Sequence, residues 1–308
     1  MSSSNAKVLK ILKIVRFHIV VGGVLAFSVG ALLALAGGGS FDPTRFILGY
    51  AVVLLGDLST HYSNDYFDVE VDKHIEQKKF FAGSGILVNN PNLRSLSRRI
   101  SLSLLAFSNI LAVGLVIFLD VPIEFFVVIL VADLVGWFYS APPLRLTSRG
   151  VGELVVACVT GLAIPGLGYL AVRSQFDPLF VYFALPFVMY GLMLSLSLEA
   201  PDVEIDRKGG KRNLVVRKGT RSVFLFVFAL SVLAALAFFV YGCFVTYSIV
   251  DFSFVFLFSL VPLTAGLFGF VNVLQKKEVN LSSALNVGSL FVFNMLMIVY
   301  LLAIIATA

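Results

Sequence analysis

The chain is poor in charge and in residues that react or bind metals through sulfur or imidazole. Charged side chains make up only 13% of its 308 residues, and it has two cysteines, three histidines and one tryptophan. So little charge is atypical of a soluble globular domain, in which about 25% is usual. Cys158 and Cys243 both lie within apolar runs. They therefore indicate small buried residues and exclude a disulfide framework or a thiolate metal site.

Apolar sequence takes the place of charge. Hydrophobic residues make up 59% of the chain, and the mean hydropathy is +0.97. Nine apolar runs approach or exceed the roughly 20 residues that a helix needs to cross a bilayer. They cover residues 18–38, 45–62, 100–119, 122–139, 151–172, 178–198, 222–243, 249–273 and 281–305. The sequence therefore predicts an all-α polytopic membrane protein, with nine transmembrane helices forming a single domain over residues 1–308.

Lysine and arginine are distributed unevenly between the two sets of loops. If the chain crosses the membrane nine times, all but two of the 23 basic residues lie on the side of the amino terminus, the exceptions being Arg45 and Arg173. The positive-inside rule then places the amino terminus in the cytoplasm and the carboxy terminus outside. The net charge of +5 is thus explained by topology. It does not indicate nucleic-acid binding, and no obligate protein partner is evident.

Two long cytoplasmic loops, at about residues 63–99 and 199–221, each begin with acidic residues and end with basic ones. We expect these loops to form a cytoplasmic cap over the helices. Carboxylates four residues apart share one face of a helix. The first loop supplies Asn64, Asp68 and Asp72 at this spacing, and the second supplies Asp202 and Asp206.

Both acidic faces continue into the apolar runs that precede them. Asp57 and His61 extend the first face, and Ser195 and Glu199 extend the second. Because acids inside a membrane are costly unless they face a protein interior or a water-filled cavity, we expect both faces to line one central cavity. Mg²⁺ prefers oxygen ligands and often bridges carboxylates to phosphates. The two clusters therefore predict a Mg²⁺ site that handles a lipid diphosphate.

The acidic clusters also fit functions that need no metal. One cluster alone fits a solvated helix end equally well, but two clusters on one side of the membrane favour bound cations, because crowded carboxylates repel one another. A secondary transporter is the competing class, since transporters also place acids between helices. Transporter acids lie nearer the middle of the membrane, whereas these lie at its edge. A lipid-binding or assembly role is a weaker third interpretation.

Three ordered motifs resemble those of the UbiA superfamily of intramembrane prenyltransferases. The family's N-x-x-x-D-x-x-x-D motif is matched by Asn64, Asp68 and Asp72, and its D-x-x-x-D motif by Asp202 and Asp206. Between them, the segment from Tyr139 and Ser140 to Arg145 is similar to the family's Tyr-Ser-x-Pro-Pro-x-Lys, with arginine in place of lysine. The resemblance covers nearly the whole chain.

The resemblance implies Mg²⁺-dependent transfer of a polyprenyl group from an allylic prenyl diphosphate to an aromatic acceptor, in contact with membrane lipid. The residues that it assigns to the metal are Asn64, Asp68, Asp72, Asp202 and Asp206. The four aspartates and Tyr139 are the expected catalytic residues. The expected substrate-binding residues are Asn64, Lys73, Ser140, Arg145 and Lys211. Roles for Asp57, His61, Asp133 and Glu153 are left open.

Two further segments resemble the menaquinone branch of this superfamily. Residues 149–153 are similar to its Arg-Gly-Leu-Gly-Glu stretch, and residues 206–214 to its Asp-x-x-x-Gly-Lys-Arg-Thr-Leu stretch. Glu199 and Pro201 depart from the asparagine and arginine that are usual there. The resemblance thus favours 1,4-dihydroxy-2-naphthoate or a related quinone precursor as acceptor, with 4-hydroxybenzoate or a glyceryl lipid alcohol as alternatives.

Overall fold

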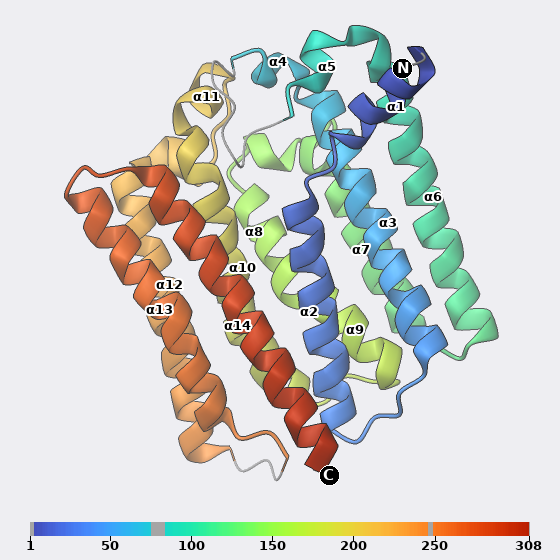
Figure 1. The fold of residues 1–308 in the computed structure, drawn as a ribbon, viewed down its shortest axis with the longest axis vertical. Coiled ribbons are helices and arrows are strands. Elements are labelled where there is room, and N and C mark those ends of the chain that lie inside the picture. Colours follow the sequence, from blue (N-terminus) through green and yellow to red (C-terminus); the bar gives the residue numbers. More distant parts are fainter. Residues whose placement is uncertain (1–2, 75–83, 246–248, 308) are drawn as a thin grey trace.

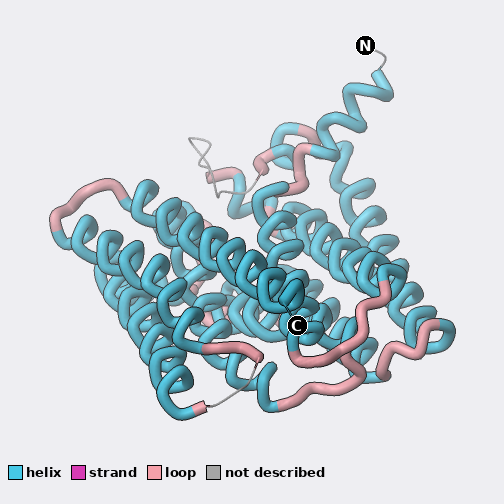
Figure 2. Tube along the Cα trace, turned by 60° about the horizontal axis from the view of Figure 1, so that its bottom comes forward, coloured by secondary structure: helices cyan, strands magenta, loops and turns pink. Residues whose placement is uncertain are grey.

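The computed structural model describes residues 3–74, 84–245 and 249–307, and every regular element in these ranges is a helix (Figure 1). The long helices lie side by side, and the connecting loops gather at the two ends of the bundle (Figure 2). The long helices are α2 (Phe17–Ala36), α3 (Pro43–Phe67), α6 (Arg94–Phe118), α7 (Ile123–Ser140), α10 (Pro178–Glu199), α12 (Leu214–Phe244), α13 (Phe252–Leu274) and α14 (Val279–Thr307).

Aspartate residues define where three of the long helices begin. Asp42 precedes α3, and its side chain accepts hydrogen bonds from the backbone N–H groups of Thr44 and Arg45. Asp177 caps α10 and Asp251 caps α13 in the same way. Pro43 and Pro178 occupy the first helical position, where a missing N–H group costs nothing. These helix starts are therefore encoded locally.

Eight helices in the described part of the chain are long and apolar enough to cross a membrane. The predicted span at residues 45–62, which becomes α3, is not among them because its polar residues lower its hydropathy. This helix nevertheless has 25 residues, or about 37 Å at 1.5 Å per residue. It packs against α6 and α7 within the bundle. The prediction of a polytopic helical membrane protein is thus confirmed.

The predicted span at 151–172 is not one regular α-helix. It consists of α8 (Gly152–Cys158), the π-helical turn η3 (Val159–Ala163) and α9 (Ile164–Val172). Pro165 at the start of α9 has no N–H group to donate to the preceding turn. π-Helical turns are uncommon and are often found at functional sites. Here η3 packs against α10, where Gly161 lies against the backbone of Val188.

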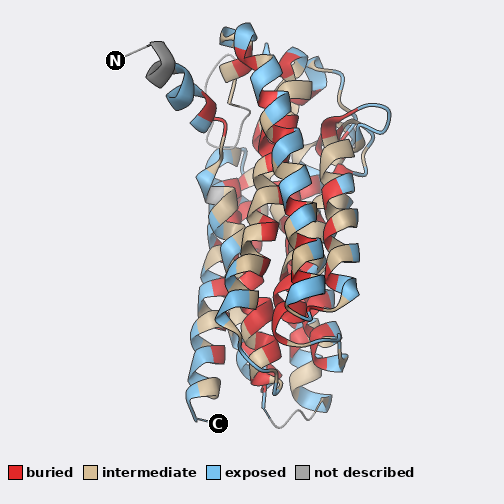
Figure 3. Cartoon of the chain, turned by 90° about the vertical axis from the view of Figure 1, so that its right-hand side faces the viewer, coloured by how far each residue is buried: buried red, intermediate tan, exposed pale blue. Residues whose placement is uncertain are grey.

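Burial follows the expectation for a membrane bundle, but the expected burial of Cys158 and Cys243 is wrong, since both are exposed on the outside of their helices. Buried residues lie mainly in the interior and exposed residues on the outer surfaces of the helices (Figure 3). Among the most exposed apolar side chains are Phe107, Phe118 and Phe244. Such side chains would meet lipid, since hydrocarbon is as apolar as they are.

The acidic clusters lie at one end of the bundle. There α4 (Val69–Asp72), α5 (Ile86–Asn89) and α11 (Val203–Lys208) lie over the helix ends, and α1 (Ser3–Leu12) projects outward from the same end, while α14 ends at the opposite pole (Figure 1). The predicted cap from the two long loops is therefore present in the described residues. Its two halves touch, because α4 packs on α11 and Gly209 lies against Val71.

Candidate functional site

A cavity of about 300 Å³ opens between the two acidic clusters and extends into the bundle. Its upper wall, at the end of the bundle that carries the cap, contains all five residues that the sequence assigns to a metal: Asn64, Asp68, Asp72, Asp202 and Asp206. Its deeper wall is largely apolar and includes Val53, Ile129, Val159, Ile164 and Leu167. The two motifs, separated by more than a hundred residues in the chain, thus line one cavity that is polar above and mostly apolar below.

Neither acidic motif lies on a continuous α-helix, which corrects the assumption behind the predicted stripes. Helix α3 ends at Phe67, and Asp68 is its C-cap with φ −91° and ψ 9°. The chain then resumes as the short helix α4. Likewise α10 ends at Glu199 and is followed by the 3-10 turn η4 (Ala200–Asp202) before α11. Packing of α4 on α11 keeps both motifs at the cavity despite these breaks.

The Lys211 ammonium lies between the two motifs. Its Nζ atom is 3.5 Å from Asp68 Oδ2 and 3.2 Å from Asp206 Oδ1. The other oxygen of Asp206, Oδ2, accepts a hydrogen bond of 2.7 Å from the Asn213 side-chain amide. In this arrangement a lysine, expected from the sequence to bind substrate, joins the first acidic cluster to the second.

Burial and neighbouring charges favour the protonated form of one motif carboxyl, Asp72. Burial, followed by the charges of Asp65 and Asp68, raises the pKa of Asp72 to about 7. Burial works against the charged form of Lys211, but Asp68 and Asp206 outweigh it and raise the pKa of the ammonium above its ordinary value. A positive charge is therefore favoured at this end of the cavity, and a divalent cation would favour the ionised form of Asp72 in the same way.

The donor set suits Mg²⁺, which takes oxygen ligands. It consists of carboxylates and one amide, and the Asn64 Oδ1 atom is buried with no hydrogen-bond partner among the described residues. Within the same residues, no three acidic, histidine or cysteine side chains are close enough together to hold one ion. The ligands that the sequence predicts are thus gathered in one cavity, but with a lysine between them.

The remaining predicted site residues are divided between the cavity wall and the surface. Tyr139 lines the cavity. Ser140 is buried beside it, and its hydroxyl has no hydrogen-bond partner in the part of the chain that the structure describes. Lys73 is exposed and pairs with Glu70 at 2.6 Å, and Arg145 is exposed as well. Substrate binding by Ser140, Lys73 and Arg145 stays a prediction.

The structure gives contacts to the acids whose roles the sequence leaves open. Asp57 Oδ1 lies 3.5 Å from His61 Nε2 on the cavity wall. Asp133 accepts a hydrogen bond of 2.8 Å from the Asn109 amide and lies against Gly56. Glu153 is buried and accepts a hydrogen bond from the backbone N–H of Leu214, the first residue of α12. Through these contacts Asp133 joins α7 to α6, and Glu153 joins α8 to the start of α12.

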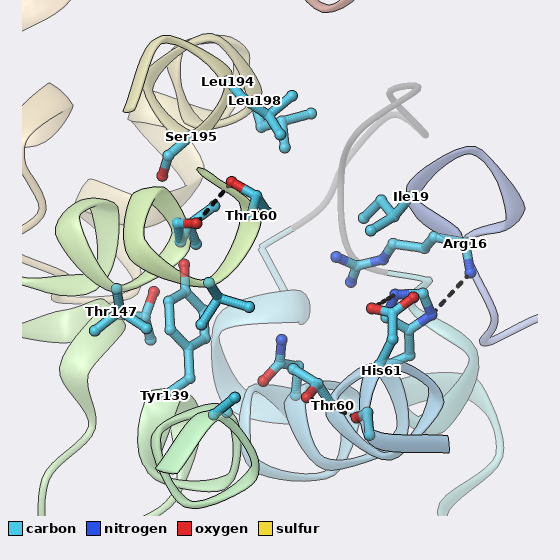
Figure 4. Close-up of a pocket in the computed structure, with 18 of the residues that line it drawn as sticks. Arg16, Ile19, Thr60, His61, Tyr139, Thr147, Thr160, Leu194, Ser195 and Leu198 are labelled. Atoms are coloured by element: carbon cyan, nitrogen blue, oxygen red, sulfur yellow. Dashed lines mark hydrogen bonds and ion pairs between the residues drawn. The ribbon is translucent and has the colours of Figure 1, made fainter. Parts of the chain in front are cut away.

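Arg16 lines the cavity, although in the sequence it is only one of the basic residues that indicate the membrane topology. Its guanidinium pairs with the buried Asp65 at 3.3 Å, and its backbone N–H donates to His61 Nδ1 at 3.3 Å. Arg16 and His61 lie on the opposite side of the cavity from Tyr139 and Thr147 (Figure 4). The sequence feature that could have identified Arg16 is its position, because it directly precedes the first apolar run, on the same side of the membrane as the acidic clusters.

The comparisons with known proteins all point to the same family. The profile of the UbiA prenyltransferase family matches residues 24–298. A digeranylgeranylglyceryl phosphate synthase of Sulfurisphaera tokodaii is 26% identical over 216 residues, covering 67% of this chain and 69% of the relative. The synthase of the same name from Sulfolobus acidocaldarius is 29% identical over 218 residues, covering 70% of this chain and 71% of the relative. Neither relative is a menaquinone-type enzyme.

Solved structures share the fold. A UbiA homologue from Archaeoglobus fulgidus bound to DMAPP and Mg²⁺ superimposes with a TM-score of 0.72, covering 97% of this chain and all of that structure, at 18% identity. A digeranylgeranylglyceryl phosphate synthase structure gives a TM-score of 0.66, with 98% and 99% coverage at 16% identity. At such identities the likeness establishes the helical arrangement alone.

Proposed function

Because the chain belongs to the UbiA prenyltransferase family, we propose that it transfers a polyprenyl group from an allylic prenyl diphosphate to the hydroxyl of a glyceryl lipid alcohol. The observation that carries this proposal is the cavity itself. Two acidic motifs converge at its upper end, and apolar side chains line its lower part. Such a cavity suits a substrate with a diphosphate head and a hydrocarbon tail.

The choice of acceptor follows from the relatives. Both relatives are named digeranylgeranylglyceryl phosphate synthase, which points to a glyceryl acceptor, and none of the comparisons supports the menaquinone branch. Glu199 and Pro201 also depart from the menaquinone motif. The glyceryl alcohol, an alternative at the level of sequence, thus replaces the naphthoate as the preferred acceptor.

In the proposed reaction, the bond between the allylic carbon and the diphosphate oxygen breaks, and a bond from that carbon to the acceptor oxygen forms. The acceptor hydroxyl releases its proton, and diphosphate departs. Mg²⁺, held by Asn64 and the four motif aspartates, would offset the charge that collects on the departing diphosphate. The apolar lower wall would bind the prenyl chain and exclude water from the allylic cation.

We further propose that α3 is the ninth span and that the acidic end of the bundle faces the cytoplasm. Helix α3 matches the other spans in length, and the polar residues that lower its hydropathy face the cavity. The basic residues support the orientation, because they concentrate at the acidic end.

The test uses purified protein, a radiolabelled prenyl diphosphate, and glyceryl, naphthoate and hydroxybenzoate acceptors in parallel. Asp68→Ala is compared with Glu70→Ala, since Asp68 lines the cavity and Glu70 is an exposed acid two residues away. We expect Mg²⁺-dependent diphosphate release and an ether product with the glyceryl acceptor. Release should fall at least about 100-fold in Asp68→Ala, as for loss of a transition-state contact, and stay near wild type in Glu70→Ala.

Two results would contradict the proposal. Release at the normal wild-type rate by Asp68→Ala, or by the wild type after chelation of Mg²⁺, would exclude the metal site. Product formation with an aromatic acceptor, but not with the glyceryl alcohol, would show that the acceptor is aromatic.

A further inference from the structure

Both carboxylate oxygens of Asp206 are already engaged within the protein. The Asn213 amide occupies Oδ2 at 2.7 Å, and the Lys211 ammonium lies 3.2 Å from Oδ1. The same ammonium lies 3.5 Å from Asp68 in the other motif. The Lys211 side chain is only 13% exposed, so this contact is shielded from solvent. An acid that the proposed function assigns to the metal is therefore held by a lysine in this structure.

The turn that carries Lys211 is fixed at both ends, whereas the lysine side chain is long and flexible. Before it, Gly210 adopts a left-handed φ of +76°, and the Lys211 N–H donates to the Asp206 carbonyl at 2.9 Å. After it, the Asn213 side chain caps α12 by accepting from the Val216 N–H at 2.9 Å. The backbone can thus stay in place while the ammonium moves, since lysine has four rotatable methylene groups.

We propose that Lys211 is an internal counter-ion that competes with divalent metal for the two acidic motifs. It neutralises and joins Asp68 and Asp206 while the site lacks diphosphate. It must leave Asp206 Oδ1 before that oxygen can accept a metal. This inference rests on the proposed function, because it assumes that the two motifs bind metal together with a diphosphate.

Electrostatics explains why the exchange would require the substrate. Withdrawing the ammonium from two carboxylates is unfavourable unless it finds another anion. A diphosphate brings that anion into the same cavity, so Lys211 can move to diphosphate oxygens as the carboxylates take up metal. Metal and diphosphate should therefore bind cooperatively, each increasing the affinity for the other by the same factor.

The experiment measures Mg²⁺ binding by calorimetry, without turnover, in the presence and absence of inorganic diphosphate. Lys211→Met removes the charge and keeps much of the side-chain length. We expect it to bind Mg²⁺ alone about tenfold more tightly than the wild type, since a competing charged contact is gone. The same variant should lose most of the cooperativity with diphosphate, because it has no ammonium to move from the carboxylates to the diphosphate.

Arg212→Met is the matched control, because Arg212 is exposed on the same turn. It should leave both affinities unchanged. Lys211→Arg keeps the charge and should restore part of the competition. If the methionine variant does not fold, the wild type and Lys211→Arg still decide: equal Mg²⁺ affinity with and without diphosphate in both overturns the proposal.

Unchanged or weaker Mg²⁺ binding by folded Lys211→Met would also overturn it. The same measurements test the proposed function separately from the lysine exchange. If the wild type binds Mg²⁺ and Asp68→Ala does not, the metal site stands even when the lysine exchange fails. If the wild type does not bind Mg²⁺ under any of these conditions, the proposed metal-dependent function fails as well.

Discussion

Arg145 follows the Pro142-Pro143 pair after α7, with its backbone in the left-handed region at φ +44° and ψ 56°. Only a few per cent of residues other than glycine adopt such a conformation, and these often lie at functional sites. Its side chain is exposed and is not part of the cavity wall. Two roles fit this position: a diphosphate ligand at the mouth of the site, or a positive charge that anchors the end of α7 at the membrane surface.

Substitution of Arg145 distinguishes these roles. We predict that Arg145→Gln raises the KM for prenyl diphosphate about three- to tenfold, and that Arg145→Lys keeps part of the wild-type affinity, since the ammonium retains the charge but not the planar fork. The KM for the acceptor should change less. Arg207→Gln is the control, because Arg207 is an exposed arginine paired with Glu204. Unchanged kinetics in Arg145→Gln would assign the residue to membrane anchoring alone.

Between elements, glycines on α2 and α9 allow a close backbone contact. A Cβ atom on Gly30 would lie 1.9 Å from the Pro165 carbonyl oxygen, and one on Gly168 would lie 2.0 Å from that of Phe27. The two helices therefore touch backbone to backbone, which small residues allow in membranes. This contact holds α9 and the π-helical turn before it, whose residues Val159 and Ala163 line the cavity.

We predict that Gly30→Ala destabilises the protein by about 1–3 kcal/mol, the usual cost of overpacking. The added methyl group would meet backbone atoms of α9, which cannot rotate away. Gly23→Ala, on the same helix, would meet nothing within 4 Å and should be neutral or slightly stabilising, because alanine favours helix more than glycine does. Thermal unfolding of both variants in detergent checks this; equal midpoints would mean that α2 and α9 can separate without cost.

Across the whole molecule, the ends of the helical bundle differ in character. α1 lies at the end with the acidic clusters, and α14 ends at the opposite end (Figure 1). A chain that starts at one end of the bundle and finishes at the other crosses it an odd number of times. This supports counting α3 together with the eight apolar spans. The basic residues concentrate at the acidic end, where they also neutralise the cluster carboxylates.

Reporter fusions test this topology. We predict that a reporter fused after Ala308 is active only outside the cytoplasm, and that one inserted near Asn90 is active only inside it. A third insertion at Asp120, in the short turn between α6 and α7, should agree with the first. Reporters at Ala308 and Asn90 that gave the same side would show that one of the nine helices does not cross.

Features that depend on neighbouring residues in the chain were predictable from the sequence. Apolar run length determines where the spanning helices lie, and Asp-Pro pairs such as Asp42-Pro43 determine where they begin. The spacing of Asn64, Asp68 and Asp72 identifies the first motif, and its polarity predicts a cavity, because hydrocarbon does not solvate carboxylates.

Tertiary structure decided what lies next to these residues. The contact of Lys211 with Asp68 depends on how α4 packs against α11, and no local pattern encodes a contact between segments so distant in sequence. Arg16 reaches Asp65 for the same reason. A side chain's spacing along its own helix is a local property, whereas its partner is determined only when the whole bundle has packed.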